Sequence, residues 1–71
     1  MDEPGTYRID VIVKAKVVKS LDRDGFTRRQ VIREATALHE SGEADIATVE
    51  RFRPGLNGWR AIYSAGSISR A

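Results

Sequence analysis

The chain has no cysteine among its 71 residues. This absence excludes disulfide bonds and thiolate metal sites, and it gives no sign of an oxidising compartment. No apolar run approaches the roughly 20 residues that a membrane-spanning helix requires. The first residues, MDEPGTYR, are acidic and lack the apolar centre of a signal peptide. We therefore expect a cytoplasmic protein that makes no contact with a membrane, and the length suits a single domain.

Residues that carry catalytic or metal-binding chemistry are scarce. His39 is the only histidine, and without a cysteine it completes neither a nucleophile–base pair nor a zinc site. Residues 22–25, DRDG, have the start of a calcium loop, but Arg33 stands where an EF-hand needs its closing glutamate. The sequence therefore predicts a protein that is not an enzyme and that uses no metal or cofactor.

Acidic residues are missing from the end of the chain. Residues 1–50 hold eight Lys/Arg and ten Asp/Glu, a net charge of −2, whereas residues 51–71 hold four arginines and no acid, a net charge of +4. A segment of one sign indicates an anionic partner, although charged segments are more often only a solvated surface.

Alternation of apolar and polar residues over 6–20 predicts a half-buried strand whose odd-numbered side is apolar. At up to about 14 residues this strand exceeds the usual length, so a bend or bulge is expected within it. Residues 21–25, LDRDG, are predicted to form a loop. A helix is then predicted over 28–41, with Thr27 and Gln30 as its capping box and Gly42 at its end.

A β-hairpin is predicted for residues 45–53 and 59–65, because Asn57-Gly58 is a preferred dipeptide for a two-residue type I′ turn. In this register Phe52 lies opposite Tyr63. The aromatic rings then collect on one face of the hairpin and the arginines on the other. Burial of one face selects the register of a strand pair, so this separation favours the two-residue turn.

The predicted fold class is α+β, a small β-α-β-β domain with a three-stranded sheet and one helix packed on one face. The domain is expected to span residues 7–66, between a flexible N-terminal tail, 1–6, and a polar C-terminal tail, 67–71. The helix is expected to cover the odd-numbered side of the first strand and the aromatic side of the hairpin. Core positions are accordingly predicted for Phe52 and Tyr63.

The open face of the predicted sheet carries six cations and a single acid, Asp10. The cations are Arg8, Lys14, Lys16, Arg51, Arg53 and Arg60. Arg28 and Arg29 add an anion-attracting corner at the start of the helix. Trp59, beside the predicted turn and partly exposed, completes the candidate binding residues.

These residues predict a non-enzymatic protein that binds nucleic acid or a nucleoprotein through phosphate contacts, with little sequence specificity. Two other interpretations remain open. The cations can serve only to discourage strand pairing and aggregation. Alternatively, apolar residues among the cations can form a homodimer or protein-binding surface; these residues are Ile12, Val18, Val49 and Ile62.

The predicted layout resembles small phage-encoded anti-CRISPR proteins, some of which join one helix to a compact antiparallel sheet. The resemblance consists of size, strand order and the hairpin sequence NGW at 57–59, and it assigns no residue roles. It implies a second class of function, a protein-binding inhibitor or adaptor that docks on a host nucleoprotein enzyme and mimics or competes for nucleic acid.

Overall fold

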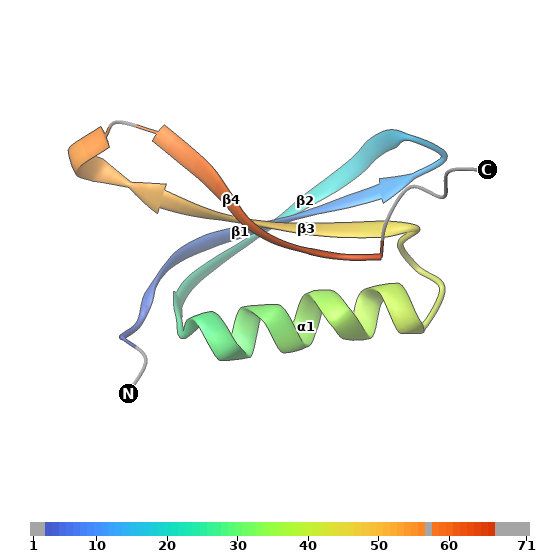
Figure 1. Cartoon of the computed structure of the whole chain (residues 1–71), viewed down its shortest axis with the longest axis horizontal. Helices are drawn as coiled ribbons and strands as arrows, with labels where there is room; N and C mark the ends of the chain where they lie inside the picture. Colours follow the sequence, from blue (N-terminus) through green and yellow to red (C-terminus); the bar gives the residue numbers. More distant parts are fainter. Residues whose placement is uncertain (1–2, 57, 67–71) are drawn as a thin grey trace.

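The computed structural model describes residues 3–56 and 58–66, which form four strands and one helix (Figure 1). In chain order the elements are β1 (Gly5–Val13), β2 (Lys16–Phe26), α1 (Arg28–Glu40), β3 (Ile46–Arg53), a 3₁₀ turn (Pro54–Leu56) and β4 (Gly58–Ala65). The strands form one antiparallel sheet in the order β2-β1-β3-β4. The α+β class is confirmed, but the predicted three-stranded sheet is wrong, because the sheet has four strands.

The additional strand comes from a tight turn inside the segment that was predicted to be one long strand. Lys14 and Ala15 have φ angles of 52° and 66°, and positive φ at both central residues is what a type I′ turn requires. The Lys14 N–H donates to Asp45 Oδ2 at 2.8 Å, which ties this turn to the start of β3. The chain then returns as β2, so the predicted loop at 21–25 is part of a strand.

Helix α1 begins and ends close to its predicted bounds. The Thr27 hydroxyl accepts a hydrogen bond from the Gln30 N–H at 3.2 Å, and the Gln30 side-chain carbonyl accepts one from the Thr27 N–H at 2.9 Å. This reciprocal capping box is the predicted one. Gly42 follows the helix with φ of +88°, a left-handed conformation that glycine adopts at little cost.

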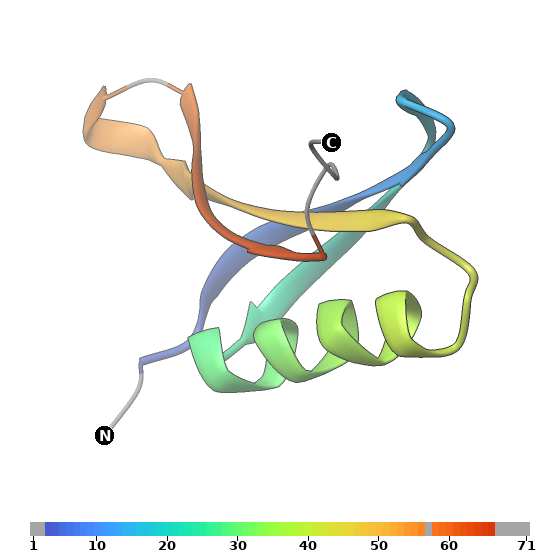
Figure 2. The ribbon, with the colours of Figure 1, turned by 45° about the vertical axis from the view of Figure 1, so that its right-hand side comes forward.

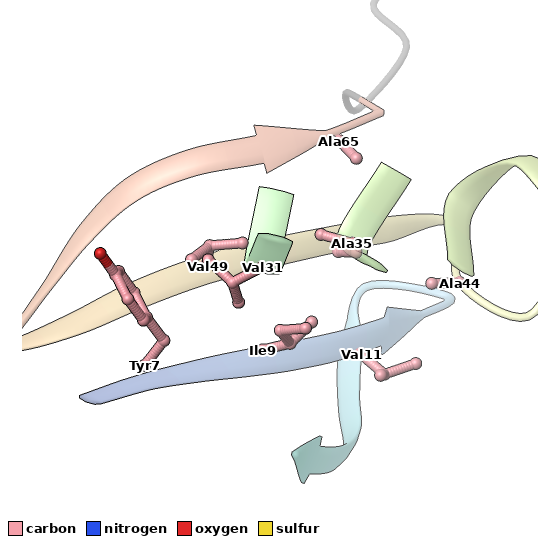
Figure 3. Close-up of a cluster of buried hydrophobic side chains, with 9 residues drawn as sticks. Tyr7, Ile9, Val11, Val31, Ala35, Ala44, Val49 and Ala65 are labelled. Carbon is pink, nitrogen blue, oxygen red and sulfur yellow. The ribbon is translucent and has the colours of Figure 1, made fainter. Parts of the chain in front are cut away.

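The core lies between α1 and the sheet face that carries the odd-numbered residues of β1, as predicted (Figure 3). Its fully or almost fully buried side chains are Tyr7, Ile9, Val11, Val31, Ala35, Ala44, Ala47, Val49 and Ala65. Most of them are small, and Tyr7 is the one aromatic residue among them. Tyr63 packs against this cluster from β4, which confirms its predicted core position.

The β3–β4 hairpin has a different register from the predicted one. Phe52 pairs with Trp59, and Arg53 pairs with Gly58, so Gly58 is a strand residue. The connection therefore begins at Pro54, and its Asn57 lies outside the described residues. The two-residue turn is wrong because the chain closes the hairpin through the 3₁₀ turn instead.

An irregularity in β4 changes which side chains face the helix. Val49 pairs with Tyr63 and the next residue of β3, Glu50, pairs with Ala61, so Ile62 is an extra residue in a β-bulge. Strict alternation from Tyr63 would have turned Trp59 toward the helix. With the bulge, Trp59 lies on the open face. Its partner Phe52 lies there as well, because alternation along β3 from buried Val49 turns it outward. The predicted core position of Phe52 is therefore wrong.

The described part of the chain begins two residues before β1 and ends directly after β4. The predicted C-terminal tail, 67–71, lies outside the described residues. Among the residues that the structure describes, no helix is long and apolar enough to cross a membrane.

Candidate functional site

Three of the predicted binding residues lie together on one side of the β3–β4 hairpin, which we call the arginine side: Arg51, Arg53 and Arg60. Arg51 pairs with Tyr7 on β1 and with Arg60 on β4. Directly paired residues project to the same face of a sheet, so the arginine side belongs to the face that α1 covers. The predicted position of these arginines on the open face is therefore wrong.

The helix nevertheless leaves the arginine side uncovered, because the hairpin extends beyond the start of α1. Figures 1 and 2 show the closed end of the β3–β4 hairpin rising away from the helix. Arg53 and Arg60 are exposed, and Arg51 is half-buried. Arg53 and Arg60 are thus available to solvent, and Arg51 is partly available, even though the three residues share a sheet face with the core.

The positive charges of the arginine side are not neutralised by nearby acidic side chains among the described residues. Arg51 and Arg60 are like charges placed directly opposite each other, an arrangement that destabilises a strand pair. Among the described residues, none of the three arginines has a carboxylate within salt-bridge distance, whereas Arg8 and Arg23 each have one. The arginine side therefore attracts anions.

Arg51 is held by its packing on the neighbouring strand. Its guanidinium carbon lies 5.6 Å from the centre of the Tyr7 ring. A Cβ atom on Gly5 would come within 3.3 Å of Arg51 Nε and Nη2, so the absence of a side chain at residue 5 makes room for the guanidinium group. Cation–π contact fixes the direction of Arg51 without neutralising its charge.

The open face of the sheet is mainly acidic, contrary to the prediction of six cations. Its cross-strand pairs include Arg8 with Asp22, Asp10 with Ser20, and Thr6 with Asp24. Glu50 also projects from this face, because it pairs with Arg8 from the other side. Four acids therefore surround one arginine. In the described ranges, no three acidic or histidine side chains form a group that could hold a metal ion.

Two of these acids interact with each other. Burial raises the pKa of Glu50, and two effects of Asp10 raise it further: its negative charge, and the hydrogen bond that protonated Glu50 donates to its side chain. The positive charge of Arg8 acts in the opposite direction. Asp10 in turn accepts a hydrogen bond from the Ser20 hydroxyl at 2.8 Å. Glu50 therefore holds its proton more tightly than a solvated glutamate does.

An aromatic cluster lies on the open face near the closed end of the β3–β4 hairpin. The ring centres of Phe52 and Trp59 are 5.2 Å apart, with an angle of 55° between the ring planes. The Arg8 guanidinium carbon lies 4.0 Å from the centre of the Trp59 ring. We call these three residues the ring cluster. It is on the opposite side of the hairpin from the arginine side.

The remaining predicted binding residues are not part of one surface. Lys14 lies in the β1–β2 turn, and Lys16 directly follows it, at the opposite end of the sheet from the β3–β4 turn (Figures 1 and 2). Arg28 and Arg29 occupy the first turn of α1. That turn lies at the same end of the molecule as the arginine side, but on a separate element.

The alternative apolar partner surface is also divided by the structure. Val49 is fully buried beneath the helix, and Ile62 packs against the core. Ile12 lies on the open face, where it pairs with Val17 and Ile46. Val18 remains 58% exposed on the edge strand β2. These residues therefore do not form the single patch that the sequence predicted.

Sequence reasoning missed the ring cluster, although one signal of it was present. The predicted register placed Glu50 among the apolar residues of the hairpin, which is an unfavourable position for a carboxylate. In the structure Glu50 lies on the polar face and Val49 lies in the core. A search for the register that removes Glu50 from the apolar side would have turned Phe52 outward as well.

Comparison with known proteins gives no match: no family model, curated protein or solved structure is significantly similar to this chain.

Proposed function

We propose that this is a non-enzymatic binding protein that holds the phosphate backbone of nucleic acid against the arginine side of its β3–β4 hairpin. The observation that carries the proposal is the set of three guanidinium groups on one side, with no carboxylate partner among the described residues. Because phosphate contacts carry no sequence information, binding has little sequence specificity.

The cross-strand pair of Arg51 and Arg60 supports an anionic ligand over a purely solubilising role. Like charges directly opposite each other cost the hairpin stability, on the order of 0.2–1 kcal/mol relative to a neutral pair. Solubility requires no such juxtaposition, since separated charges serve equally well. An anion bound by the two arginines would reduce the repulsion, so ligand binding would offset a cost that is present in the free protein.

The arrangement suits a polymer of regularly spaced charges. Arg51 and Arg53 are two residues apart in an extended strand, so their Cα atoms are separated by about 6.8 Å. Arg60 extends the row onto the edge strand β4. Three contacts with successive phosphates would release counterions and make binding strongly dependent on salt.

The test is a titration of labelled single-stranded and duplex oligonucleotides at about 50 mM and about 200 mM salt, the range over which phosphate contacts lose most of their affinity. The wild-type protein is compared with the double variant Arg53→Gln/Arg60→Gln. Each lost phosphate contact should reduce the slope of log K against log salt by about 0.7–0.9, so the double variant should lose most of the salt dependence.

The matched control is Arg33→Gln/Lys19→Gln, which removes the same charge from two exposed positions outside the hairpin. It should bind almost as well as the wild type. Equal weakening of both double variants would mean that only the net charge matters. Absence of binding at low salt would refute the proposal and favour the other interpretations, among them a protein-binding inhibitor or adaptor.

A further inference from the structure

We infer that the ligand is single-stranded, because the ring cluster offers a stacking surface for an unpaired base on the other side of the same hairpin. This inference deepens the proposed function and rests on it. It starts from a feature that the core does not explain: Phe52 and Trp59 are large, half-buried residues on the sheet face opposite α1 (Figure 2).

The geometry of the ring cluster is that of a partly assembled stack. Arg8 lies over one face of the Trp59 ring at 4.0 Å, and its side chain is 34% exposed. Bases stack both on aromatic rings and on the planes of arginine guanidinium groups. A base could stack on the Arg8 guanidinium group and extend this stack. Alternatively, it could displace Arg8 and stack directly on the Trp59 ring.

The charges of the open face restrict the path of the ligand. Asp10 and Glu50 lie on this face on the two central strands, and Asp22 lies on β2, the edge strand opposite β4. Their negative charges repel phosphates. A nucleic acid backbone consequently cannot run across the centre of the sheet. It can run along the outer edge of β4, which is an edge strand.

Along that edge, neighbouring side chains supply both kinds of contact. Trp59 projects to the open face and Arg60, the next residue, projects to the arginine side. A single strand lying on the edge can thus turn a base toward Trp59 and a phosphate toward Arg60. A duplex cannot do so, because its bases are already stacked and paired inside the helix.

The experiment uses the single tryptophan of the chain as its reporter. Single-stranded DNA, duplex DNA and an abasic oligonucleotide of the same length are titrated while tryptophan emission and anisotropy of the labelled ligand are recorded. The single strand should quench Trp59 and bind more tightly than the other two. The abasic strand has the same phosphates but no bases, so it should bind weakly and leave the emission unchanged.

Two variants test the stacking contact directly. Trp59→Leu should lower the affinity for the single strand by about 5- to 150-fold, the equivalent of 1–3 kcal/mol per stacked base, and leave duplex binding unchanged. Arg8→Gln retains the tryptophan and should reduce both affinity and quenching. Val17→Ala, an exposed apolar position elsewhere on the open face, is the matched control, and circular dichroism verifies that each variant is folded.

The outcomes separate the two proposals. Salt-dependent binding of all three ligands with similar affinity and no quenching would overturn the inference and leave phosphate binding by the arginine side in place. Quenching by the abasic strand as strong as by the normal one would also overturn it. If no ligand binds at low salt, both proposals fail.

Discussion

At the scale of single residues, the hydroxyl groups of two tyrosines have opposite effects on stability, because one has a hydrogen-bond partner among the described residues and the other does not. Tyr7 is fully buried, and its hydroxyl has no hydrogen-bond partner among the residues that the structure describes. The Tyr63 hydroxyl lies 3.1 Å from the Thr36 hydroxyl. An unpaired buried polar group costs free energy, whereas a paired one contributes a modest net amount.

Replacing each tyrosine by phenylalanine should therefore have opposite effects on stability. Tyr7→Phe removes a desolvated group without a partner and should raise the free energy of unfolding by about 1 kcal/mol, whereas Tyr63→Phe loses a hydrogen bond and should lower it by about 1 kcal/mol. Urea unfolding of the two variants beside the wild type measures both. A loss of stability in Tyr7→Phe would show that its hydroxyl has a partner.

Glu50 predicts a pH dependence of stability. Burial and Asp10 raise its pKa above the ordinary value of 4.5, so the folded state binds the proton more tightly than the unfolded state. The free energy of unfolding therefore falls as the pH rises from 4.5 through the raised pKa of Glu50. Ionised Glu50 destabilises the fold above that pKa, and the cost disappears below the unfolded value.

Glu50→Gln cannot ionise and should be more stable than the wild type at neutral pH. It should also show a smaller loss of stability as the pH rises above 4.5. Urea unfolding over a series of pH values tests both statements. Glu3→Gln, an exposed position before β1, is the control and should follow the wild type. Identical pH profiles for Glu50→Gln and the wild type would contradict the assignment.

At the scale of elements, the sequence predicted those segments whose local signals agree with their burial. The capping box, the apolar stripe of α1 and the odd-numbered side of β1 all point to the structure that forms. Strand β2 was missed because it is an edge strand with little burial, so it lacks an alternating pattern. The turn before it uses Lys14 and Ala15, which are not residues that favour positive φ.

The candidate site was predicted in part for a related reason. Arg51, Arg53 and Arg60 do share one side of the hairpin, since the three project to the same face in both registers although Arg60 has a different partner in each. Which face they occupy depends on the pairing of β3 with β1, which buries Val49, and, for Arg60, on the bulge at Ile62. Neither is marked by a distinctive composition, and the Asn57-Gly58 dipeptide favoured a different turn. The sequence therefore predicted the cluster and placed it on the wrong face.

The like-charge pair of the hairpin connects its stability to its proposed function. Arg60→Glu places opposite charges across the strands and should raise stability by about 0.2–1 kcal/mol at low salt, while binding of oligonucleotides is lost. Arg60→Gln should have an intermediate effect on both. Unfolding at low and high salt measures the electrostatic part, because screening reduces it. A fall in stability in Arg60→Glu would mean that repulsion is absent.

At the scale of the whole molecule, the two hairpins extend to opposite ends of a sheet that one helix covers only in part (Figures 1 and 2). The core residues of β3 are Ala47 and Val49, in the half nearer its start. Strand β3 remains paired with β1 as far as Arg51, and beyond that residue the hairpin is held mainly by its own backbone hydrogen bonds and side-chain pairs. Segments with few buried contacts open locally at a lower free energy than the core.

Hydrogen exchange should reveal this gradient. Backbone amides of Ile9 and Val49 should exchange most slowly, and amides at 51–53 and 58–61 should exchange faster through local opening. Addition of the single-stranded oligonucleotide should slow exchange in the hairpin and leave the β1–β2 turn unaffected. Uniform protection throughout the sheet would contradict this description, and protection confined to the β1–β2 turn would place the ligand at the other end.

Ile62, the bulge residue of β4, places the aromatic and the cationic side chains on opposite sides of the hairpin. If regular pairing continued from Val49 and Tyr63 to the closed end of the hairpin, Arg53 would lie opposite Trp59. Each side of the hairpin would then carry both an aromatic ring and a cation. Strand β4 instead absorbs Ile62 and changes phase, which sorts the indole to one side and the guanidinium groups to the other. Deletion of Ile62 would remove the bulge and leave regular pairing from Tyr63 to Gly58. Trp59 and the arginines would still lie on opposite sides of the hairpin, so this position accepts a change in length without altering either surface.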